Sequence, residues 1–523
     1  MEHWGAPDSN PLQFLTSPKD LKWFVGECWE KKPHVFEATG EKKKVFDGLF
    51  TCDSLKNILK EREALGGAGP LNFGIDLNAA MYVNGVRETP NGEVGDSETV
   101  WGLFEKGATL QFIQPQRFQE NLRALCAALE SQLGCLVGCN AYITPKGTQG
   151  LAPHHDDVEL FICQTEGSKT WRLHTPINNY SLPALPSGNL SQEEAGEPIK
   201  EVTLNVGDVL YMPKGTVHQA VAQKANSVHL TISTYQRWSW GDLALTLMQH
   251  AMTAKEPVIG APLALREGLP HGFVNTSGAL TGKSSAVQVG MKELAKRLHA
   301  LADAVEKKES LFRVAVDSMA EDVISGRMPP LEEQMPEKGA APTLRDSVRV
   351  RGTGLFRLMP VESDEGGVDP SMVQLVSCLK NPVHKHMIAG LPSDCDSDFE
   401  EMMEDEDEEC EITACCPSEK SKDEKMKAGP PAGAELAEGS IEDVEIDEDE
   451  DGSQVLVLES SFTEAVQQIL GAGSQGVPVR SLKLETDQLK MGCVTALWED
   501  GMISTLPSEN GSKGKTPKKA RKK

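Results

Sequence analysis

The sequence lacks both a run of about 18 apolar residues and any Cys-x-x-Cys pair. The first absence argues against a membrane-spanning helix, because a span needs about 20 consecutive apolar residues. The second argues against a zinc finger, although the chain has 12 cysteines. The opening stretch MEHWGAPDSNPLQF also has neither the basic nor the apolar region of a signal peptide. We therefore expect a protein that is neither embedded in a membrane nor secreted.

Four cysteines indicate the redox compartment. Cys126, Cys135, Cys139 and Cys163 stand among apolar residues rather than in polar loops. This placement is typical of reduced thiols buried in a core, as found in cytosolic and nuclear proteins. We expect no disulfide framework.

The negative charge is concentrated in one segment. Residues 394–451 hold 25 Asp and Glu against 4 Lys, within a chain whose net charge is −26. Such a segment buries too little apolar surface to fold alone, so we expect a disordered acidic insertion over 394–452. It would attract basic partners or serve only as a solvated linker.

The basic tail 509–523, ending in KKARKK, is typical of a nuclear or nucleolar localisation signal or of a nucleic-acid contact. A merely solubilising tail is the alternative.

The pattern of apolar residues changes along the chain. Residues 108–240 show short apolar strands separated by Gly and Pro turns, which are typical of a β-barrel or sandwich. Upstream, Asn84-Gly85 lies between two strand-like runs and predicts a hairpin. After residue 240 apolar residues recur at helical spacing, which predicts long helices that pack on each other or on a second copy. A chain of 523 residues exceeds a single core, and the fold class is predicted to be α+β.

The stretch GLAPHHDDVELFI, residues 150–162, contains two overlapping His-x-Asp pairs. Side chains at i and i+2 of a strand share a face, so one pair is expected to bind a common ion. The even positions continue with Val158, Leu160 and Ile162, and this more apolar face is expected to line a barrel interior. The register therefore predicts His154 and Asp156 as ligands. His155 would then not bind, and Asp157 and Glu159 would face outward.

A third ligand is expected at His218, in the strand-and-turn segment VGDVLYMPKGTVHQA. Two histidines and one carboxylate bind one face of Fe(II) and leave three positions open. Those positions suit a bidentate 2-oxo acid and O₂. The alternative is that the His-x-Asp pair arose by chance and that His218 is a core or surface histidine.

Longer blocks carry a resemblance. The segments NAYITPKGTQGLAPHHDDVELFICQTEGSKTWRLHTP, LNVGDVLYMPKGTVHQA and HLTISTYQRWSWGD are similar to JmjC-type Fe(II)/2-oxoglutarate oxygenases and, more narrowly, to the ribosomal oxygenases. The upstream block ATLQFIQPQRF and the late block VRSLKLETDQLKMGCVTALWEDGMIST extend the similarity over most of the chain. The family usually has Tyr between the first two metal ligands, where this chain has His155.

The resemblance implies a double-stranded β-helix, or cupin-type barrel, followed by a helical dimerisation region and a C-terminal winged helix. The segments implied are a JmjC catalytic domain 1–240, a helical dimerisation region 241–330, winged-helix parts 331–393 and 453–508 around the acidic insertion, and the basic tail.

The resemblance also assigns site residues. It places iron on His154, Asp156 and His218, and the carboxylate clamp for 2-oxoglutarate on Lys169 and Tyr142. Other positions that match the family are pocket residues Asn140 and Ser233, and residues near the peptide substrate, Asn78, Gln111 and Gln114. No catalytic side chain beyond the metal ligands is implied. Without the resemblance, Lys169 would be a solvated strand lysine and Tyr142 a core residue.

The implied activity is hydroxylation of a histidine on a large-subunit ribosomal protein, with Fe(II), 2-oxoglutarate and O₂, by a nuclear or nucleolar homodimer. One alternative is demethylation of methyl-lysine on histone H3, which uses the same oxidative chemistry. A second is a non-enzymatic chromatin or ribosome scaffold, which loss of a ligand or of the lysine would have favoured.

Overall fold

The computed structural model describes residues 10–64, 70–234, 237–255, 259–271, 273, 285–352, 354–362, 368–388 and 454–506. The chain divides into two compact units, Met1–Met387 with Ile446–Lys523, and Ile388–Glu445. The predicted acidic insertion 394–452 and basic tail 509–523 lie outside the described residues. All of the described helices and strands belong to the first unit.

In the described part of the chain, six helices precede or interrupt the first strands. They are α1 (Pro11–Thr16), α2 (Leu21–Glu27), α3 (Gly40–Phe46), α4 (Cys52–Ala64), α5 (Ser97–Glu105) and α6 (Glu120–Leu133). Several begin where a polar side chain accepts a hydrogen bond from the first turn, as Asp20 does for α2 and Asp96 for α5. Gly134 ends α6 in the left-handed conformation that glycine adopts readily.

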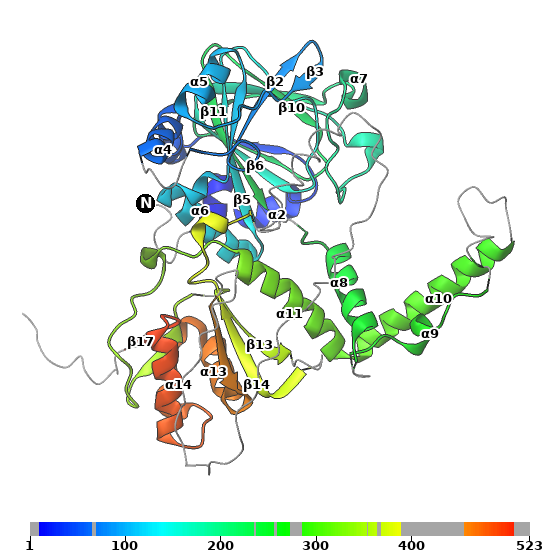
Figure 1. Cartoon of the computed structure of the whole chain (residues 1–523), viewed down its shortest axis with the longest axis vertical. Helices are drawn as coiled ribbons and strands as arrows, with labels where there is room; N and C mark the ends of the chain where they lie inside the picture. Colours follow the sequence, from blue (N-terminus) through cyan, green and yellow to red (C-terminus); the bar gives the residue numbers. More distant parts are fainter. Residues whose placement is uncertain are drawn as a thin grey trace, which may run out of the picture. The chain divides into compact units, whose positions relative to one another are not determined.

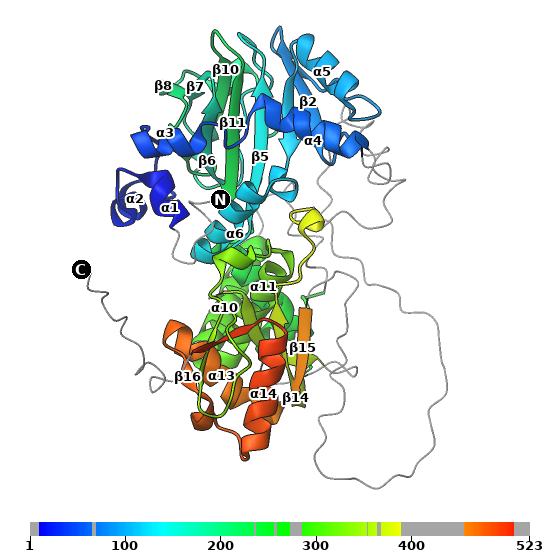
Figure 2. The same ribbon diagram turned by 90° about the vertical axis from the view of Figure 1, so that its left-hand side faces the viewer.

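An antiparallel sheet of eight strands forms the larger wall of the barrel (Figure 1). Its order is β1 (His34–Phe36), β9 (Val209–Met212), β6 (Glu159–Glu166), β11 (Ser227–Thr234), β5 (Val137–Thr144), β4 (Thr109–Ile113), β2 (Leu77–Val83) and β3 (Val86–Glu88). Figure 2 shows β11 between β5 and β6. The hairpin predicted at Asn84-Gly85 is confirmed: β2 pairs with β3, and both turn residues have positive φ, 53° and 85°.

A second antiparallel sheet faces the first. It consists of β10 (His218–Ala222), β7 (Ser168–Leu173) and β8 (Lys200–Asn205) in that order, with α7 (Gln192–Ala195) in the β7–β8 connection. Apolar side chains fill the space between the sheets, with Leu160 and Ile162 from the larger one and Trp171 and Leu173 from the smaller. The predicted cupin-type β fold with added helices is thereby confirmed.

The other face of the larger sheet is also buried. Phe161 and Cys163 of β6 belong to the main hydrophobic core together with residues of the N-terminal helices, such as Phe24 and Phe46. Cys126, Cys135, Cys139 and Cys163 are buried free thiols, as expected. Both faces of β6 therefore pack against protein, as its burial pattern shows.

That double burial corrects one prediction. Glu159 was expected to face outward, but it is fully buried, and it accepts hydrogen bonds from the Tyr211 hydroxyl and from Lys214 N at 3.3 Å. Asp157 is half-buried. The strand β6 begins only at Glu159, so alternation does not extend back through residues 155–158. The inward direction predicted for Leu160 and Ile162 is confirmed.

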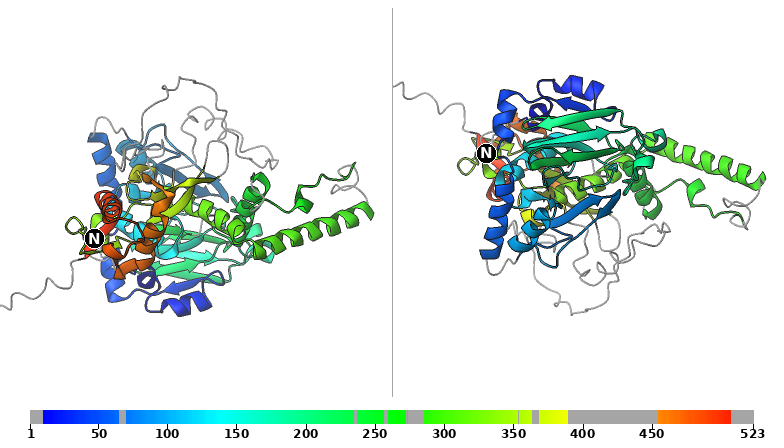
Figure 3. Two further views of the ribbon diagram at one scale, coloured as in Figure 1. Left: turned by 90° about the horizontal axis from the view of Figure 1, so that it is seen from below. Right: turned by 90° about the horizontal axis from the view of Figure 1, so that it is seen from above.

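Helices follow the barrel, as the change of spacing predicted: α8 (Trp240–Thr253), α9 (Leu263–Arg266), α10 (Ser285–Lys307) and α11 (Glu309–Gly326). Helix α8 packs on α11, and α9 lies beside the long α10 (Figure 3). Among the described residues, no helix combines the length and apolar character that crossing a membrane requires.

Two three-stranded sheets follow. The first is β16 (Val477–Pro478), β12 (Ser347–Val350) and β17 (Ile503–Leu506), and the second is β13 (Phe356–Glu362), β14 (Val368–Ser377) and β15 (Gln454–Glu459). With α13 (Thr463–Ala472) and α14 (Asp487–Glu499) they enclose one core. Strands β14 and β15 pair although the acidic segment separates them in sequence. Short 3₁₀ turns complete the unit: η1 (Pro115–Arg117), η2 (Ile177–Asn179), η4 (Glu332–Gln334), η5 (Val383–Lys385), η6 (Ser460–Phe462), η7 (Gly473–Gln475) and η8 (Val479–Ser481).

Candidate metal centre

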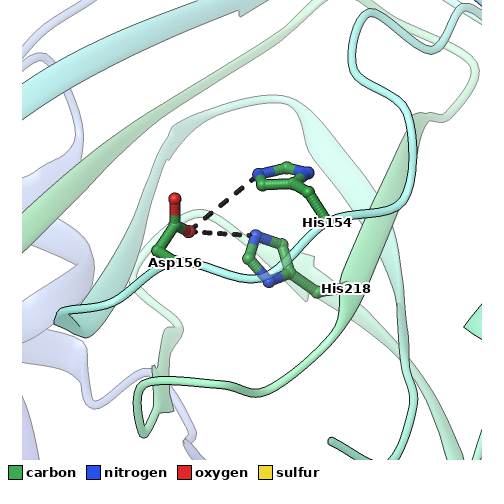
Figure 4. Close-up of side chains that lie close together, drawn as sticks. All are labelled: His154, Asp156 and His218. Carbon is green, nitrogen blue, oxygen red and sulfur yellow. Dashed lines mark ion pairs between the residues drawn. The ribbon is translucent and has the colours of Figure 1, made fainter. Parts of the chain in front are cut away.

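Backbone hydrogen bonds bring three side chains from two segments together. His154 N donates to His218 O at 3.2 Å, and His218 N donates to His154 O at 2.8 Å, which ties the 150–158 segment to the start of β10. Gly215 N donates to Asp156 O at 2.9 Å from the β9–β10 turn. The three side chains consequently converge, as Figure 4 shows.

The convergent atoms are spaced as metal ligands are. Asp156 Oδ2 lies 3.6 Å from His218 Nε2 and 3.9 Å from His154 Nε2. One ligand atom from each residue lies within 4.8 Å of the other two. The Asp156 side chain remains 35% exposed and that of His154 22%, so the cluster is open on one side. A two-histidine, one-carboxylate set with an open side fits Fe(II), which binds such a set on one face.

The orientation of both imidazoles also suits metal binding. His154 Nδ1 lies 2.8 Å from Ala152 O and His218 Nδ1 lies 2.9 Å from Thr216 O. A proton on each Nδ1 satisfies these carbonyls and leaves the Nε2 lone pair free for a metal. Burial lowers the pKa of His218 to about 4, so its ring is neutral at physiological pH. His155, in contrast, is outside the cluster; it is buried, and its backbone N donates to Ser187 Oγ at 2.9 Å.

A cavity adjoins the cluster and reaches between the two sheets. Five polar residues on four strands line it beside His154, Asp156 and His218: Thr109, Tyr142, Lys169, His229 and Thr231. Trp171 and Ile162 contribute apolar walls. Because strand residues alternate, the same alternation that aims Ile162 inward places Lys169 and Trp171 on one side of β7.

Lys169 is buried, and no acidic side chain among the described residues pairs with it. The residue is only 5% exposed, and its Nζ donates to Thr144 Oγ1 at 3.0 Å. Burial alone lowers the pKa of Lys169 to about 7. An amine in this state gains most from an incoming carboxylate, since the charge-assisted hydrogen bond restores the protonated form.

Tyr142 lies on the same cavity wall. Gln111 Nε2 donates to its hydroxyl at 3.1 Å, and its ring stacks on His229 with centroids 5.1 Å apart and an interplanar angle of 6°. Burial raises the pKa of the phenol, so it stays a neutral donor. Lys169 and Tyr142 thus both present donors to one cavity, as the clamp assignment requires.

His229 is one of the cavity residues that sequence reasoning missed, with Thr109 and Thr231. It is 2% exposed, and burial lowers its pKa well below the ordinary value. Its Nδ1 and Trp171 Nε1 are buried without hydrogen-bond partners in the described part of the chain. Two such atoms on one cavity suit a polar ligand. The signal was available: in HLTISTY, His229 alternates with Thr231 and Ser233 on one strand face.

The remaining predicted residues surround the cavity without lining it. Asn140 pairs with Thr231 across β5 and β11, and Ser233 pairs with Leu160. Asn78 lies opposite Gln111 and accepts from Asn91 Nδ2 at 3.1 Å. Gln114 is 9% exposed, and its side-chain oxygen accepts from Cys139 N at 3.2 Å.

Comparison with known proteins identifies the family. The model of the JmjC domain matches residues 111–243. The mouse protein named Ribosomal oxygenase 2 is 30% identical over 520 residues, which cover 95% of this chain and 92% of that protein. The chain belongs to the ribosomal oxygenases.

Other ribosomal oxygenases align with part of the chain. The zebrafish protein named Ribosomal oxygenase 1 is 36% identical over 329 residues, which are 61% of this chain and 57% of that relative. A Dictyostelium discoideum relative, named Bifunctional lysine-specific demethylase and histidyl-hydroxylase NO66, is 33% identical over 67% of this chain and 66% of its own length. This chain therefore spans less than two thirds of these two relatives. Among solved structures, Escherichia coli ycfD aligns with a TM-score of 0.40 and 17% identity, over 66% of this chain and 83% of that one.

Proposed function

We propose that this ribosomal oxygenase hydroxylates a protein side chain with Fe(II), 2-oxoglutarate and O₂. The observation that carries the proposal is the cavity that contains both an open two-histidine, one-carboxylate cluster and a buried lysine that pairs with no acidic side chain of the described residues. The cluster fits Fe(II), and the lysine fits the distal carboxylate of 2-oxoglutarate.

Different residues of the site would bind the metal and the cosubstrate. His154, Asp156 and His218 would hold the metal, and Lys169 with Tyr142 would hold the distal carboxylate. When bound, Fe(II) and 2-oxoglutarate would supply the oxidation: 2-oxoglutarate and O₂ would give succinate and CO₂, with one oxygen atom of O₂ entering succinate and the other entering a substrate C–H bond. The protein orients the cosubstrate and excludes water, and the apolar walls of Trp171, Leu160 and Ile162 serve the second purpose. No side chain has to act as a general base.

We propose a histidine of a large-subunit ribosomal protein as the substrate. The names of the relatives support the ribosomal target, and the Dictyostelium name includes histidyl hydroxylation. Asn78 and Gln111, opposite one another on β2 and β4, would supply amide groups near the peptide. Gln114, whose side chain is engaged with Cys139 N, would act by holding this edge in place. Asn140 and Ser233, on β5 and β11 beside the cavity, would support its wall.

A second candidate is demethylation of methyl-lysine on histone H3, because the same Dictyostelium name includes a lysine-specific demethylase. The oxidative chemistry is shared, so the metal cluster does not separate the two. A scaffold without activity is the third candidate, and the intact ligand set with its buried lysine speaks against it.

We also propose the finer organisation. The region 241–330 would form a homodimer, because Leu294 and Leu298 of α10 leave 57% and 46% of their surfaces exposed. Segments 331–393 and 453–508 would form a winged helix, which fits the shared core around α13 and α14. The basic tail would direct the protein to the nucleus and nucleolus and allow nucleic-acid contact.

Mass spectrometry of candidate peptides tests the activity. Peptides from basic ribosomal proteins and methylated histone H3 tails are incubated with the protein, Fe(II), 2-oxoglutarate and O₂. Addition of one oxygen to a histidine is the expected result, and loss of a methyl group from lysine would favour the second candidate. Asp156→Ala should abolish either product, whereas Asp157→Ala, the adjacent carboxylate outside the cluster, should retain it. If neither product nor turnover of 2-oxoglutarate were observed, the third candidate, a scaffold without activity, would be favoured.

A further inference from the structure

A buried chain of hydrogen bonds runs from the C-terminal half of the unit to the cavity. His386 follows η5, which contacts η1 of the barrel and lies beside α6, as the yellow turn in Figure 1. The residue is 3% exposed. Nδ1 lies 3.1 Å from Gln116 Nε2, and Nε2 lies 3.0 Å from Glu130 Oε1. His386 is more than 250 residues distant in sequence from both partners.

The direction of each bond is fixed by its neighbours. Cys139 N donates to Gln114 Oε1 at 3.2 Å, so that side-chain oxygen is an acceptor. Gln116 Nε2 therefore donates to the same oxygen and uses its second hydrogen for His386. His386 must then accept at Nδ1 and carry its proton on Nε2, from which it donates to Glu130. One arrangement of donors and acceptors therefore satisfies every hydrogen bond in this series.

The chain continues into the cavity wall. Gln114 has a positive φ of 52°, and its backbone N donates to Asn140 Oδ1 at 3.3 Å. Asn140 precedes Tyr142 by two residues on the same face of β5, and Gln111 Nε2 donates to the Tyr142 hydroxyl at 3.1 Å. Because the Gln111 amide donates to the phenol oxygen and Asn140 lies beside it, the hydroxyl hydrogen is directed away from the amide, into the cavity that Tyr142 lines.

The other end of the chain is firmly anchored. Glu130 is 1% exposed, and it accepts from Met328 N at 2.8 Å and Val137 N at 3.2 Å besides His386. Arg327 Nε lies 3.9 Å from its carboxylate. Loss of the imidazole therefore leaves Glu130 with partners, but it deprives Gln116 of its acceptor. The effect of His386 should pass toward Gln114 rather than toward Glu130.

We propose that His386 is a positioning residue for 2-oxoglutarate: through Gln116, Gln114 and Asn140 it holds the Tyr142 hydroxyl in the direction that meets the cosubstrate carboxylate. The C-terminal half of the unit thereby completes a site whose ligands all lie in the barrel. The inference rests on the proposed function, because it needs Tyr142 to bind that carboxylate.

The test is the dissociation constant of 2-oxoglutarate, measured by titration calorimetry with Mn(II) in place of Fe(II) and without O₂, so that no turnover is involved. His386→Ala should weaken binding by about three- to tenfold, the effect of one hydrogen bond, with Mn(II) affinity unchanged. His386→Gln keeps a donor and an acceptor and should restore binding. His384→Ala is the matched control, because His384 is exposed two residues away.

A double-mutant cycle separates positioning from a structural role. If His386 acts through the phenol, His386→Ala should add nothing to Tyr142→Phe. Additive losses, or full binding by His386→Ala, would overturn the inference. Gln116→Leu breaks the chain from the barrel side and serves if His386→Ala does not fold; Gln116 Oε1 is buried and has no hydrogen-bond partner in the described part of the chain, so the substitution removes no bond of that oxygen. If Lys169→Ala and Tyr142→Phe themselves left binding unchanged, the proposed function would fail instead.

Discussion

Replacing Lys169 by methionine should stabilise the protein while removing its cosubstrate binding. Lys169 is buried, its amine donates to Thr144 Oγ1 at 3.0 Å, and burial lowers its pKa to about 7 from the ordinary 10.5. The folded state therefore disfavours the charged amine, which the unfolded chain accepts without cost. A methionine of similar length has no such penalty.

The magnitude follows from the two pKa values. At 1.36 kcal/mol per pKa unit, the change from 10.5 to about 7 corresponds to about 5 kcal/mol of destabilisation. The methionine variant also loses the hydrogen bond to Thr144, which lowers its gain in stability by about 1 kcal/mol. Between pH 7 and 10.5 the unfolded chain binds more protons than the folded one, so the stability of the natural protein rises with pH in this window. The cost is therefore complete below pH 7 and disappears toward pH 10.5.

Urea denaturation at pH 6, 8 and 10 measures this difference. Lys169→Met should be more stable by about 4 kcal/mol at pH 6, and the advantage should shrink steadily at the two higher pH values. Lys200→Met, on the neighbouring strand β8 where Lys200 is exposed, is the control and should change stability little at any pH. A less stable Lys169→Met, or an advantage independent of pH, would refute the reasoning. Retained 2-oxoglutarate binding by this variant would refute the role of the amine.

Three further predictions concern the same unit. In the proposed clamp, the protonated amine of Lys169 binds the carboxylate, so the dissociation constant of 2-oxoglutarate should rise about tenfold per pH unit above pH 7; a flat profile between pH 7 and 9 in calorimetry would contradict this. Asp156→Ala should lose Mn(II) binding, measured by electron paramagnetic resonance, by at least about tenfold; equal loss in Asp157→Ala would contradict the ligand assignment. Leu294→Glu with Leu298→Glu should convert a dimer to a monomer in sedimentation while barrel melting is unchanged, and an unaltered mass would remove α10 from the interface.

The barrel and the candidate metal cluster were largely predictable, because strand alternation and turn residues are local signals. Asn84-Gly85 correctly predicted a hairpin. The His-x-Asp motif and the strand-and-turn segment around His218 were enough to select the three residues of the cluster. The choice between the two His-x-Asp pairs was nevertheless reached through an alternation that the backbone does not follow at residues 155–158. The backbone bonds between His154 and His218, which actually determine the cluster, join distant segments and leave no local signal.

The burial of Glu159 could not be predicted for a related reason. Alternation tells which residues share a face, but the covering of the second face by N-terminal helices depends on packing between distant segments. His386 is a stronger example, because its partners Gln116 and Glu130 lie in the barrel. A single sequence shows a histidine near an acidic segment and nothing about those contacts.

Glu159 and Lys169 show how partners separate a structural charge from a functional one. Both are buried strand residues, and burial moves the pKa of each to about 7. The Glu159 carboxylate receives bonds from the Tyr211 hydroxyl and Lys214 N, so its polar atoms are already satisfied by the fold. Lys169 donates to a hydroxyl and faces a cavity where His229 Nδ1 and Trp171 Nε1 are buried without partners in the described part of the chain. Only the second arrangement leaves binding capacity unused, so it is Lys169 rather than Glu159 that points to an anionic ligand.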